Sequence, residues 1–349
     1  MRGIPGARSY LSAVDPVVIV GAGVAGLACA QALAAAGRAP VILERGRGVG
    51  GRCATRRLEG QPVDLGPAFL HGKAPDFLAA LAAVPAIAVK AWPAHIEGVG
   101  RPCQPEAFDP TETRLAFADG LTAFPKALAR GLTVQTGVQV LGVEADGAQL
   151  KLLLAAGAPM RATTVVLAVA PEQAIGLLDE NAHGAMATLR AMLSMSPSEP
   201  ALSLAALYPA DAPAPAWQVL YPEASRILQL VSHDSSKRTA PGFRALVFQT
   251  HPRWSGEHLD DPTWPEQVLA EGGRVVGPWA ASPLHRYAQR WSYARTGRSG
   301  ELAAPMFFLF PDGARLGVCG DRFAPGGGVE AAWRAGRSLA ARILSMEKT

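Results

Sequence analysis

The sequence contains few cysteines, and none is arranged to hold a metal or to form a redox pair. The four cysteines, Cys29, Cys53, Cys103 and Cys319, form no CxxC pair, and no histidine-rich segment lies near them. A zinc site or a paired-thiol redox centre is therefore not expected, and we predict no metal. Unpaired cysteines are typical of a reducing compartment, so we expect a cytoplasmic protein.

Long apolar runs and dense basic stretches are also missing. No run approaches the roughly 18 apolar residues of a membrane-spanning helix, and the opening residues lack the apolar core of a secretory leader. The 33 lysines and arginines are scattered and exceed the acidic residues by only four. These absences argue against a membrane protein and against nucleic-acid binding.

The composition does supply enough apolar material for a large core. With 349 residues, 49% of them hydrophobic, the chain suits one large domain or two intertwined domains. The β-branched run Val17–Val20 predicts a buried parallel strand, and the glycine-rich segment Gly21–Gly26 follows it directly. A helix of small residues over 27–37 and a second strand over 40–44 complete a βαβ unit.

Each conspicuous residue of this unit has a mechanical role in binding a dinucleotide. Gly21 permits a tight turn, Gly23 lets the backbone approach a pyrophosphate, and Gly26 lets helix and strand pack closely. The start of the helix, at Val24 and Ala25, offers N–H groups to the phosphates. Glu44 ends the second strand, where a carboxylate accepts ribose hydroxyls and disfavours the 2′-phosphate of NADP.

A second glycine pair follows the acid. Gly50, Gly51 and Arg52 come shortly after Arg45 and would bring a second stretch of backbone and a guanidinium to the same pyrophosphate. A chance match occurs at residues 272–274, but no glycine fingerprint precedes that one. In its placement after the ribose-binding acid, the first triplet resembles the FAD-dependent amine oxidase superfamily. The resemblance implies FAD as the cofactor.

Two further segments resemble motifs of that superfamily. Asp64, Leu65 and Gly66 begin a stretch that ends at His71, and the resemblance implies that it runs beside the flavin ring. Val138 ends a predicted strand over 132–138, and the resemblance places such a residue against the adenine. Val138 is equally well explained as part of the core.

The superfamily's closing motif is also matched, near the end of the chain. A strand over 316–319 runs into Gly320 and Asp321, and a glycine run precedes a helix that includes Gly328 and Val329. The resemblance implies that Asp321 holds the ribityl chain and that the helix start faces the pyrimidine side of the flavin. A helix N-terminus stabilises negative charge there.

These motifs are spread along the chain, so we expect a discontinuous cofactor domain. The predicted fold class is α/β, a Rossmann-type FAD-binding domain with an inserted α+β substrate domain that contains a mostly antiparallel sheet. Alternating runs over 201–208 and 244–249 supply strands of that sheet. We assign residues 14–72, 123–175 and 301–349 to the first domain, 73–122 and 176–300 to the second, and 1–13 to an N-terminal extension.

The segment from Leu284 to Ala294 points to a subgroup. Its Arg-Trp-x-Tyr-Ala sequence, residues 290–294, resembles renalase and its bacterial relatives. The resemblance implies hydride transfer to flavin N5, reoxidation by O2 to give H2O2, and a dihydronicotinamide isomer of NAD(P)H as the substrate. The protein would orient the substrate while the cofactor supplies the chemistry.

Candidate catalytic residues lie in the same segments. His71 is a candidate base or substrate contact, with a packing histidine as the alternative. Trp291 and Tyr293 are candidates for the pocket wall together with His285 and Arg286, with the aromatic residues as core as the alternative. Arg286 or Arg290 would suit an anionic substrate, although either is equally consistent with an ordinary surface residue.

Three functions remain open on this basis. The first is a renalase-like oxidase of dihydronicotinamides, the second an FAD-dependent oxidase or dehydrogenase of amines or a specialised metabolite. The third is a flavin-binding protein without turnover. We expect FAD to be bound non-covalently, because residues 326–333 contain no cysteine. We expect a small-molecule substrate, O2 as electron acceptor, and a monomer or weak homodimer.

Overall fold

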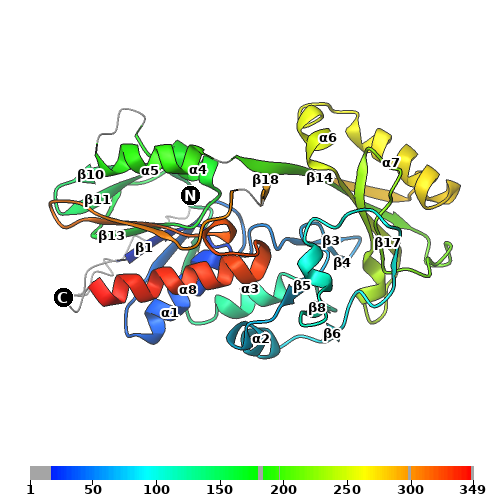
Figure 1. Cartoon of the computed structure of the whole chain (residues 1–349), viewed down its shortest axis with the longest axis horizontal. Helices are drawn as coiled ribbons and strands as arrows, with labels where there is room; N and C mark the ends of the chain where they lie inside the picture. Colours follow the sequence, from blue (N-terminus) through cyan, green and yellow to red (C-terminus); the bar gives the residue numbers. More distant parts are fainter. Residues whose placement is uncertain (1–16, 180–183, 196, 298–299, 347–349) are drawn as a thin grey trace, which may run out of the picture.

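The structure is a computed structural model that describes residues 17–179, 184–195, 197–297 and 300–346. Two six-stranded sheets lie toward opposite ends of an elongated molecule (Figure 1). Smaller sheets and helices connect them. The α/β fold class and its mostly antiparallel second sheet are as predicted from the sequence. The predicted N-terminal extension, residues 1–13, lies outside the described residues.

The first sheet contains the predicted βαβ unit. Its order is β19-β20-β13-β1-β2-β9, and all neighbours are parallel except β19 and β20. The strands are β1 (Val17–Val20), β2 (Val41–Glu44), β9 (Thr133–Thr136), β13 (Thr164–Leu167), β19 (Met306–Leu309) and β20 (Arg315–Val318). The chain passes from β1 to β2 on one side and to β13 on the other. Such a switch point leaves a crevice at the carboxyl ends of the strands.

Three helices lie together below this sheet in Figure 1. They are α1 (Val24–Ala35), α3 (Ala123–Leu128) and α8 (Gly328–Met346). Helices α1 and α8 pack closely at Gly336, where a Cβ would lie 2.1 Å from the carbonyl oxygen of Ala25. Helix α1 ends at Ala35, and Gly37 has a φ of +81°, the left-handed conformation that is common just after a helix.

A three-stranded antiparallel sheet and two helices lie above the first sheet in Figure 1. These elements are β10 (Val140–Asp146), β11 (Gln149–Leu154), β12 (Met160–Ala162), α4 (Pro171–Leu177) and α5 (Ala185–Ser194). A hairpin turn at Asp146 and Gly147 joins β10 to β11, with a φ of +61° at Gly147. Helix α5 packs against α4, and its buried residues Met186, Leu189 and Leu193 belong to the same core cluster as the strands of the first sheet.

The second sheet has the order β18-β14-β17-β16-β15-β7, antiparallel except between β15 and β7. Its strands are β7 (Ile96–Glu97), β14 (Ser198–Tyr208), β15 (Val219–Leu220), β16 (Leu228–His233), β17 (Arg244–Thr250) and β18 (His285–Thr296). One face packs against α6 (Pro252–Glu257), α7 (Trp264–Val275) and the 3-10 helix η3 (Pro278–Ala281) around buried Trp264. The other face packs against Val63 and Leu65.

Short elements from residues 55 to 117 fill the space between the two sheets. They are β3 (Thr55–Leu58), β4 (Gln61–Asp64), β5 (Leu70–Gly72), α2 (Pro75–Ala82), β6 (Ala88–Lys90), η1 (Pro105–Phe108) and β8 (Thr113–Phe117). Two further 3-10 helices, η2 (Asp234–Lys237) and η5 (Asp321–Phe323), follow strands of the second and first sheets. These connections place the carboxyl edge of the first sheet opposite one face of the second.

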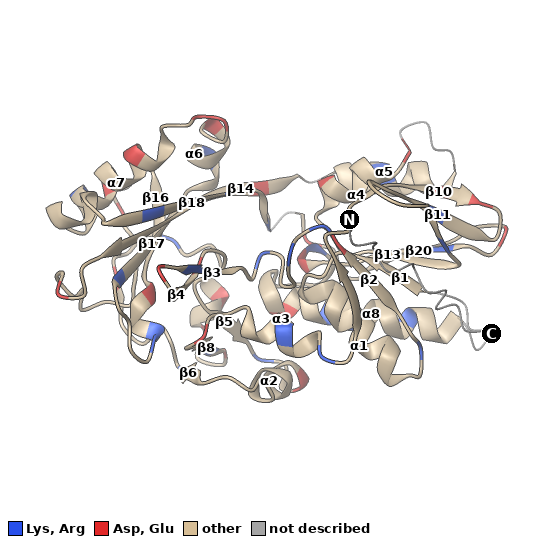
Figure 2. Ribbon diagram, turned by 180° about the vertical axis from the view of Figure 1, so that it is seen from behind, with Lys and Arg blue, Asp and Glu red and all other residues tan. Residues whose placement is uncertain are grey.

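Charged residues are dispersed over both halves of the ribbon in Figure 2. In the described part of the chain, no helix is both long and apolar enough to cross a bilayer.

Candidate functional site

A cavity of about 1470 Å³ opens where the two halves meet. Residues that follow β1, β2 and β13 line one side, and residues from β14, β17 and β18 line the other. This volume exceeds the roughly 300–1,000 Å³ of an ordinary small-molecule pocket. There is therefore room for a dinucleotide and for a second, smaller molecule beside it.

The glycines of the first loop play two different parts. A Cβ on Gly21 would lie 2.6 Å from the carbonyl oxygen of Ala168, and one on Gly26 would lie 2.2 Å from the carbonyl oxygen of Gly21. Both glycines are therefore required by packing, and Gly26 does not line the cavity. Gly23 does line it and has nothing within 4 Å of its Cβ position. Its bare backbone leaves open space where a ligand can approach closely.

The second glycine loop is attached to the first. The N–H of Gly50 donates to the carbonyl oxygen of Ala22 over 2.9 Å, and a Cβ on Gly51 would lie 3.5 Å from the Cα of Gly23. Gly50 and Gly51 both have positive φ, of +118° and +53°. The two loops thus form one stretch of side-chain-free backbone at the start of α1, the kind of surface that accepts a pyrophosphate.

Glu44 closes one end of this surface. Its two carboxylate oxygens accept hydrogen bonds from the N–H groups of Ala22, at 2.9 Å, and Gly46, at 2.6 Å. These bonds fix the carboxylate at the cavity wall and leave each oxygen with capacity for a further hydroxyl donor. Arg45 and Val138 line the same end, and Val138 also packs against the hydrophobic core.

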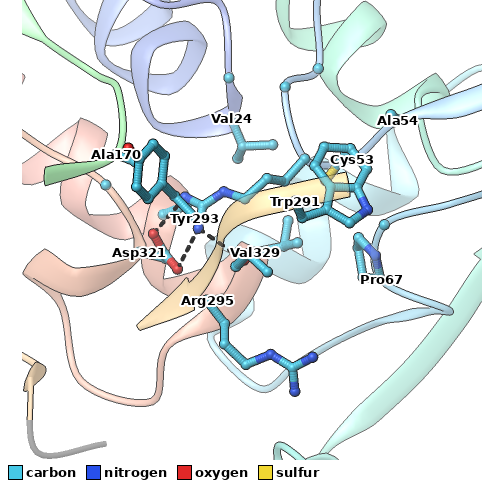
Figure 3. A pocket seen from close by; sticks show the side chains of 18 of the residues that line it. Val24, Cys53, Ala54, Pro67, Ala170, Trp291, Tyr293, Arg295, Asp321 and Val329 are labelled. Atoms are coloured by element: carbon cyan, nitrogen blue, oxygen red, sulfur yellow. Dashed lines mark hydrogen bonds and ion pairs between the residues drawn. The ribbon is translucent and has the colours of Figure 1, made fainter. Parts of the chain in front are cut away.

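Arg52 and Asp321 both line the cavity and form an ion pair with each other. Arg52 makes two hydrogen bonds to the carboxylate, Nη2 to Oδ1 at 2.6 Å and Nη1 to Oδ2 at 3.1 Å (Figure 3). The pair joins the second glycine loop to η5, which is 269 residues further along the chain. Gly320 lines the cavity beside it.

The N-terminus of α8 closes the other end of the cavity. Gly326, Gly327 and Gly328 all have positive φ, from +59° to +93°, and Gly328 and Val329 line the cavity. The helix has 19 residues, so its N–H groups and its positive dipole end are directed at this region. An anionic ring edge placed here would be stabilised.

The structure places Asp64 differently from the expectation. Asp64 is buried and does not line the cavity, whereas Leu65 and Gly66 do. Its carboxylate accepts from Lys237 at 2.7 Å and Arg238 at 3.0 Å, and Asp234 pairs with the same two cations. Burial by itself would raise the pKa of Asp64, but the two cations lower it to about 2. We name these four residues the buried charge cluster.

His71 lines the cavity from β5 with both ring nitrogens engaged. Nδ1 lies 3.1 Å from Oε2 of Glu112, and Nε2 lies 3.3 Å from Oε1 of Gln104. Gln104 in turn donates to the carbonyl oxygen of Gly326 at 3.3 Å. His71 is therefore connected to the glycine run that precedes α8.

Trp291 and Tyr293 both line the cavity from β18 (Figure 3). The indole N–H of Trp291 donates to the carbonyl oxygen of Leu65 over 3.2 Å, and Tyr293 is 38% exposed. Arg290 lines the cavity as well. Arg286 does not line it, and its guanidinium pairs with Glu266 at 2.7 Å on the exposed surface.

Sequence reasoning missed several polar side chains of the cavity wall: Ser203, Tyr221, Gln249, Gln104 and Arg295. Gln249 donates to the carbonyl oxygen of Gly66 and so helps to hold the loop that follows β4. Arg295 shares the strand periodicity of Trp291 and Tyr293, and that signal was sufficient to find it. In the described residues, no cluster of three or more potential metal ligands occurs.

Comparison with known proteins identifies the first part of the chain. Residues 19–83 match the family model of the NAD(P)-binding Rossmann-like domain. AofH of Mycobacterium tuberculosis, whose assigned name is flavin-containing monoamine oxidase, is 40% identical over 82 residues. That match covers 24% of this chain and 17% of the relative's length.

Solved structures resemble the whole chain. Cyclohexylamine oxidase from Brevibacterium oxydans has a TM-score of 0.72 at 14% identity, covering 96% of this chain and all (100%) of the other. Putrescine oxidase bound to putrescine has a TM-score of 0.69 at 17% identity, covering 95% and 99%. The chain shares its fold with two amine oxidases.

Proposed function

We propose that this protein is an FAD-dependent oxidase of the amine oxidase type. The observation that carries the proposal is the joined backbone of the two glycine loops, with Glu44 at one end of the same cavity and the start of α8 at the other. This arrangement fits an extended dinucleotide whose ring system lies beyond Arg52. The shared fold with amine oxidases supports the same assignment.

Each end of the site suits a different part of FAD. Glu44 would accept the ribose hydroxyls, Gly23 and Gly51 would receive the pyrophosphate, and Arg52 and Asp321 would hold the ribityl chain and the phosphate next to it. The N-terminus of α8 would stabilise negative charge on the pyrimidine side. When bound, FAD would accept a hydride at N5 and return the electrons to O2 to give H2O2.

Binding is proposed to be non-covalent. Two cysteines line the cavity, Cys53 and Cys103. Burial raises the pKa of the Cys53 thiol to about 12 and also raises that of Cys103. Both therefore remain protonated near neutral pH, which leaves them poor nucleophiles toward a flavin.

The residues on the second sheet would receive the substrate. Gln249 and Trp291 donate to the carbonyl oxygens of Gly66 and Leu65, and Ser203 lines the cavity with them. His71, oriented by Glu112, is the side chain placed to hold or accept a proton near the start of α8. A small amine is our first candidate substrate.

A dihydronicotinamide remains the second candidate. The observation in its favour is that the renalase-like segment, from Arg290 to Ala294, lines the cavity wall. A flavin-binding protein without turnover is the third possibility, and the same experiment distinguishes it.

The test uses the purified full chain. We expect a yellow protein that releases FAD into the supernatant on acid denaturation. Anaerobic mixing with a panel of amines and with isomeric dihydronicotinamides should bleach the flavin, and air should restore the colour with formation of H2O2. A colourless protein that takes up no FAD would refute the proposal. Bleaching by dihydronicotinamides alone would select the second candidate, and bleaching by nothing would select the third.

A further inference from the structure

Arg295 brings to the cavity wall a positive charge that the functions assigned above leave unused. It lies near the end of β18 and lines the cavity two positions beyond Tyr293. Figure 3 shows its side chain extending away from Arg52 and Asp321. The guanidinium therefore lies away from the part of the cavity assigned to the ribityl chain.

The groups that contact this guanidinium are neutral. Its Nη1 donates to Oε1 of Gln229 over 3.0 Å and also contacts the sulfur of Cys103. Tyr221 lines the same part of the cavity. Burial raises the pKa of the Cys103 thiol and of the Tyr221 hydroxyl, so neither carries a negative charge near neutral pH.

No carboxylate of the described residues lies within ion-pair distance of this guanidinium. Among the described residues, Arg52 forms an ion pair with Asp321, but Arg295 forms none with any aspartate or glutamate. Glu199 stands opposite Arg295 in the register of β14 and β18, and even this residue makes no ion pair with it. A half-buried guanidinium without a counter-charge costs desolvation energy that an anion entering the cavity would recover.

We propose that the substrate carries an anionic group, a carboxylate or a phosphate, which docks on Arg295. This inference rests on the proposed function and specifies its substrate class. The guanidinium offers a planar set of donors that matches two oxygens of such a group. A substrate with a second cationic amine, such as a diamine, would be repelled at this position, and the reacting end of the substrate would point toward the start of α8.

Direct binding is the first test and does not depend on turnover. Isothermal titration calorimetry with benzoate and with inorganic phosphate compares the wild-type FAD-loaded protein with Arg295→Gln. We expect the variant to bind the preferred anion about tenfold to a hundredfold more weakly, the effect of losing a charge-assisted hydrogen bond. Arg286→Gln is the matched control, because Arg286 lies on the same strand and outside the cavity. It should bind like the wild type.

Kinetics then separate the two sources of the anion. Hexylamine and ε-aminocaproate form a pair of amines that differ by a carboxylate, and dihydronicotinamide mononucleotide supplies a phosphate. The wild type should prefer one anionic substrate through a lower KM, and Arg295→Gln should abolish the preference with kcat little changed. Preference for ε-aminocaproate identifies a carboxylate, and preference for the mononucleotide identifies a phosphate.

Two outcomes would overturn the proposal. One is equal affinity of wild type and Arg295→Gln for both anions, and the other is a wild type that binds neither anion. Failure of the proposed function looks different, because a protein whose flavin no substrate reduces would still bind the anion through Arg295.

Discussion

The two halves of the molecule build their sides of the cavity by different means. On the side of the first sheet, the surface is backbone, kept bare by Gly23 and Gly51 and held in place by packing at Gly26. On the side of the second sheet, the surface is made of side chains such as Gln249, Trp291 and Arg295. A site made of backbone depends on glycines that keep the surface bare, such as Gly23, and on glycines that packing forbids to change, such as Gly26. A site made of side chains can change substrate by single replacements.

The buried charge cluster joins these two halves, and we expect its disruption to cause the largest loss of stability. Lys237 is buried, contacts Asp64 at 2.7 Å and Asp234 at 2.6 Å, and donates to the carbonyl oxygen of Ala68 at 3.0 Å. Lys237→Met would leave two buried carboxylates with a single cation. We expect the free energy of unfolding to fall by about 3–5 kcal/mol in urea titrations.

The control for this variant is a lysine in an exposed ion pair. Lys151 contacts Glu144 at 3.1 Å, with both side chains at least 30% exposed. Lys151→Met should cost less than about 1 kcal/mol. Equal losses in the two variants would show that burial of the cluster is not what stabilises the joint between the halves.

Comparison of Asp64 with the glycine loops shows how far sequence alone can predict such a site. The glycines were predictable because their reasons are local: a strand before them, a helix after them and an acid at the next strand end. The Asp64 carboxylate is taken by Lys237, 173 residues away in the sequence. A three-residue motif carries no information about that partner. The motif therefore predicted the course of the backbone at Leu65 and Gly66, but not where the Asp64 side chain points.

The strands of the second half were predicted from the sequence, but the residues of those strands that line the cavity were mostly not. Alternation located β14 and β17, yet it does not say which residues of a strand meet a cavity formed with distant segments. Arg295 could have been placed with Trp291 and Tyr293 by period two. Gln104 lies in a loop between short elements and gives no such signal.

Acid should destabilise the half that is built from side chains. His233 ends β16 and is buried against Trp217, and this burial, with the nearby charge of Arg244, lowers its pKa to about 4. In the unfolded chain this histidine becomes protonated near pH 6.5, whereas in the folded chain its protonation requires about pH 4. Stability from this group is thus complete above pH 6.5 and is lost as the pH falls, by about 3 kcal/mol at pH 4.

Thermal or urea unfolding between pH 4 and pH 7 measures the slope of the unfolding free energy against pH. His233→Gln should reduce it, and the same change at exposed His95 should leave it intact. His251, whose pKa burial also lowers, accounts for part of the slope that remains. An unchanged slope in His233→Gln would locate the acid sensitivity outside this sheet.

The smallest expected loss of stability comes from a pair of glycine variants. The pair separates the packing role of the first loop from its role in binding FAD. Gly26→Ala puts a Cβ 2.2 Å from the carbonyl oxygen of Gly21, so α1 must shift away from β1, at a cost of about 1–3 kcal/mol. Gly23→Ala meets no atom within 4 Å and should unfold like the wild type. Its methyl group would instead occupy the space that a pyrophosphate needs, so FAD affinity should fall at least about tenfold.

Urea titration of the flavin-free proteins and FAD titration of the folded ones measure the two effects separately. Full FAD affinity in Gly23→Ala would show that the bare backbone at Gly23 is not part of the FAD-binding surface. The difference between a backbone surface on the first half and a side-chain surface on the second would then not hold.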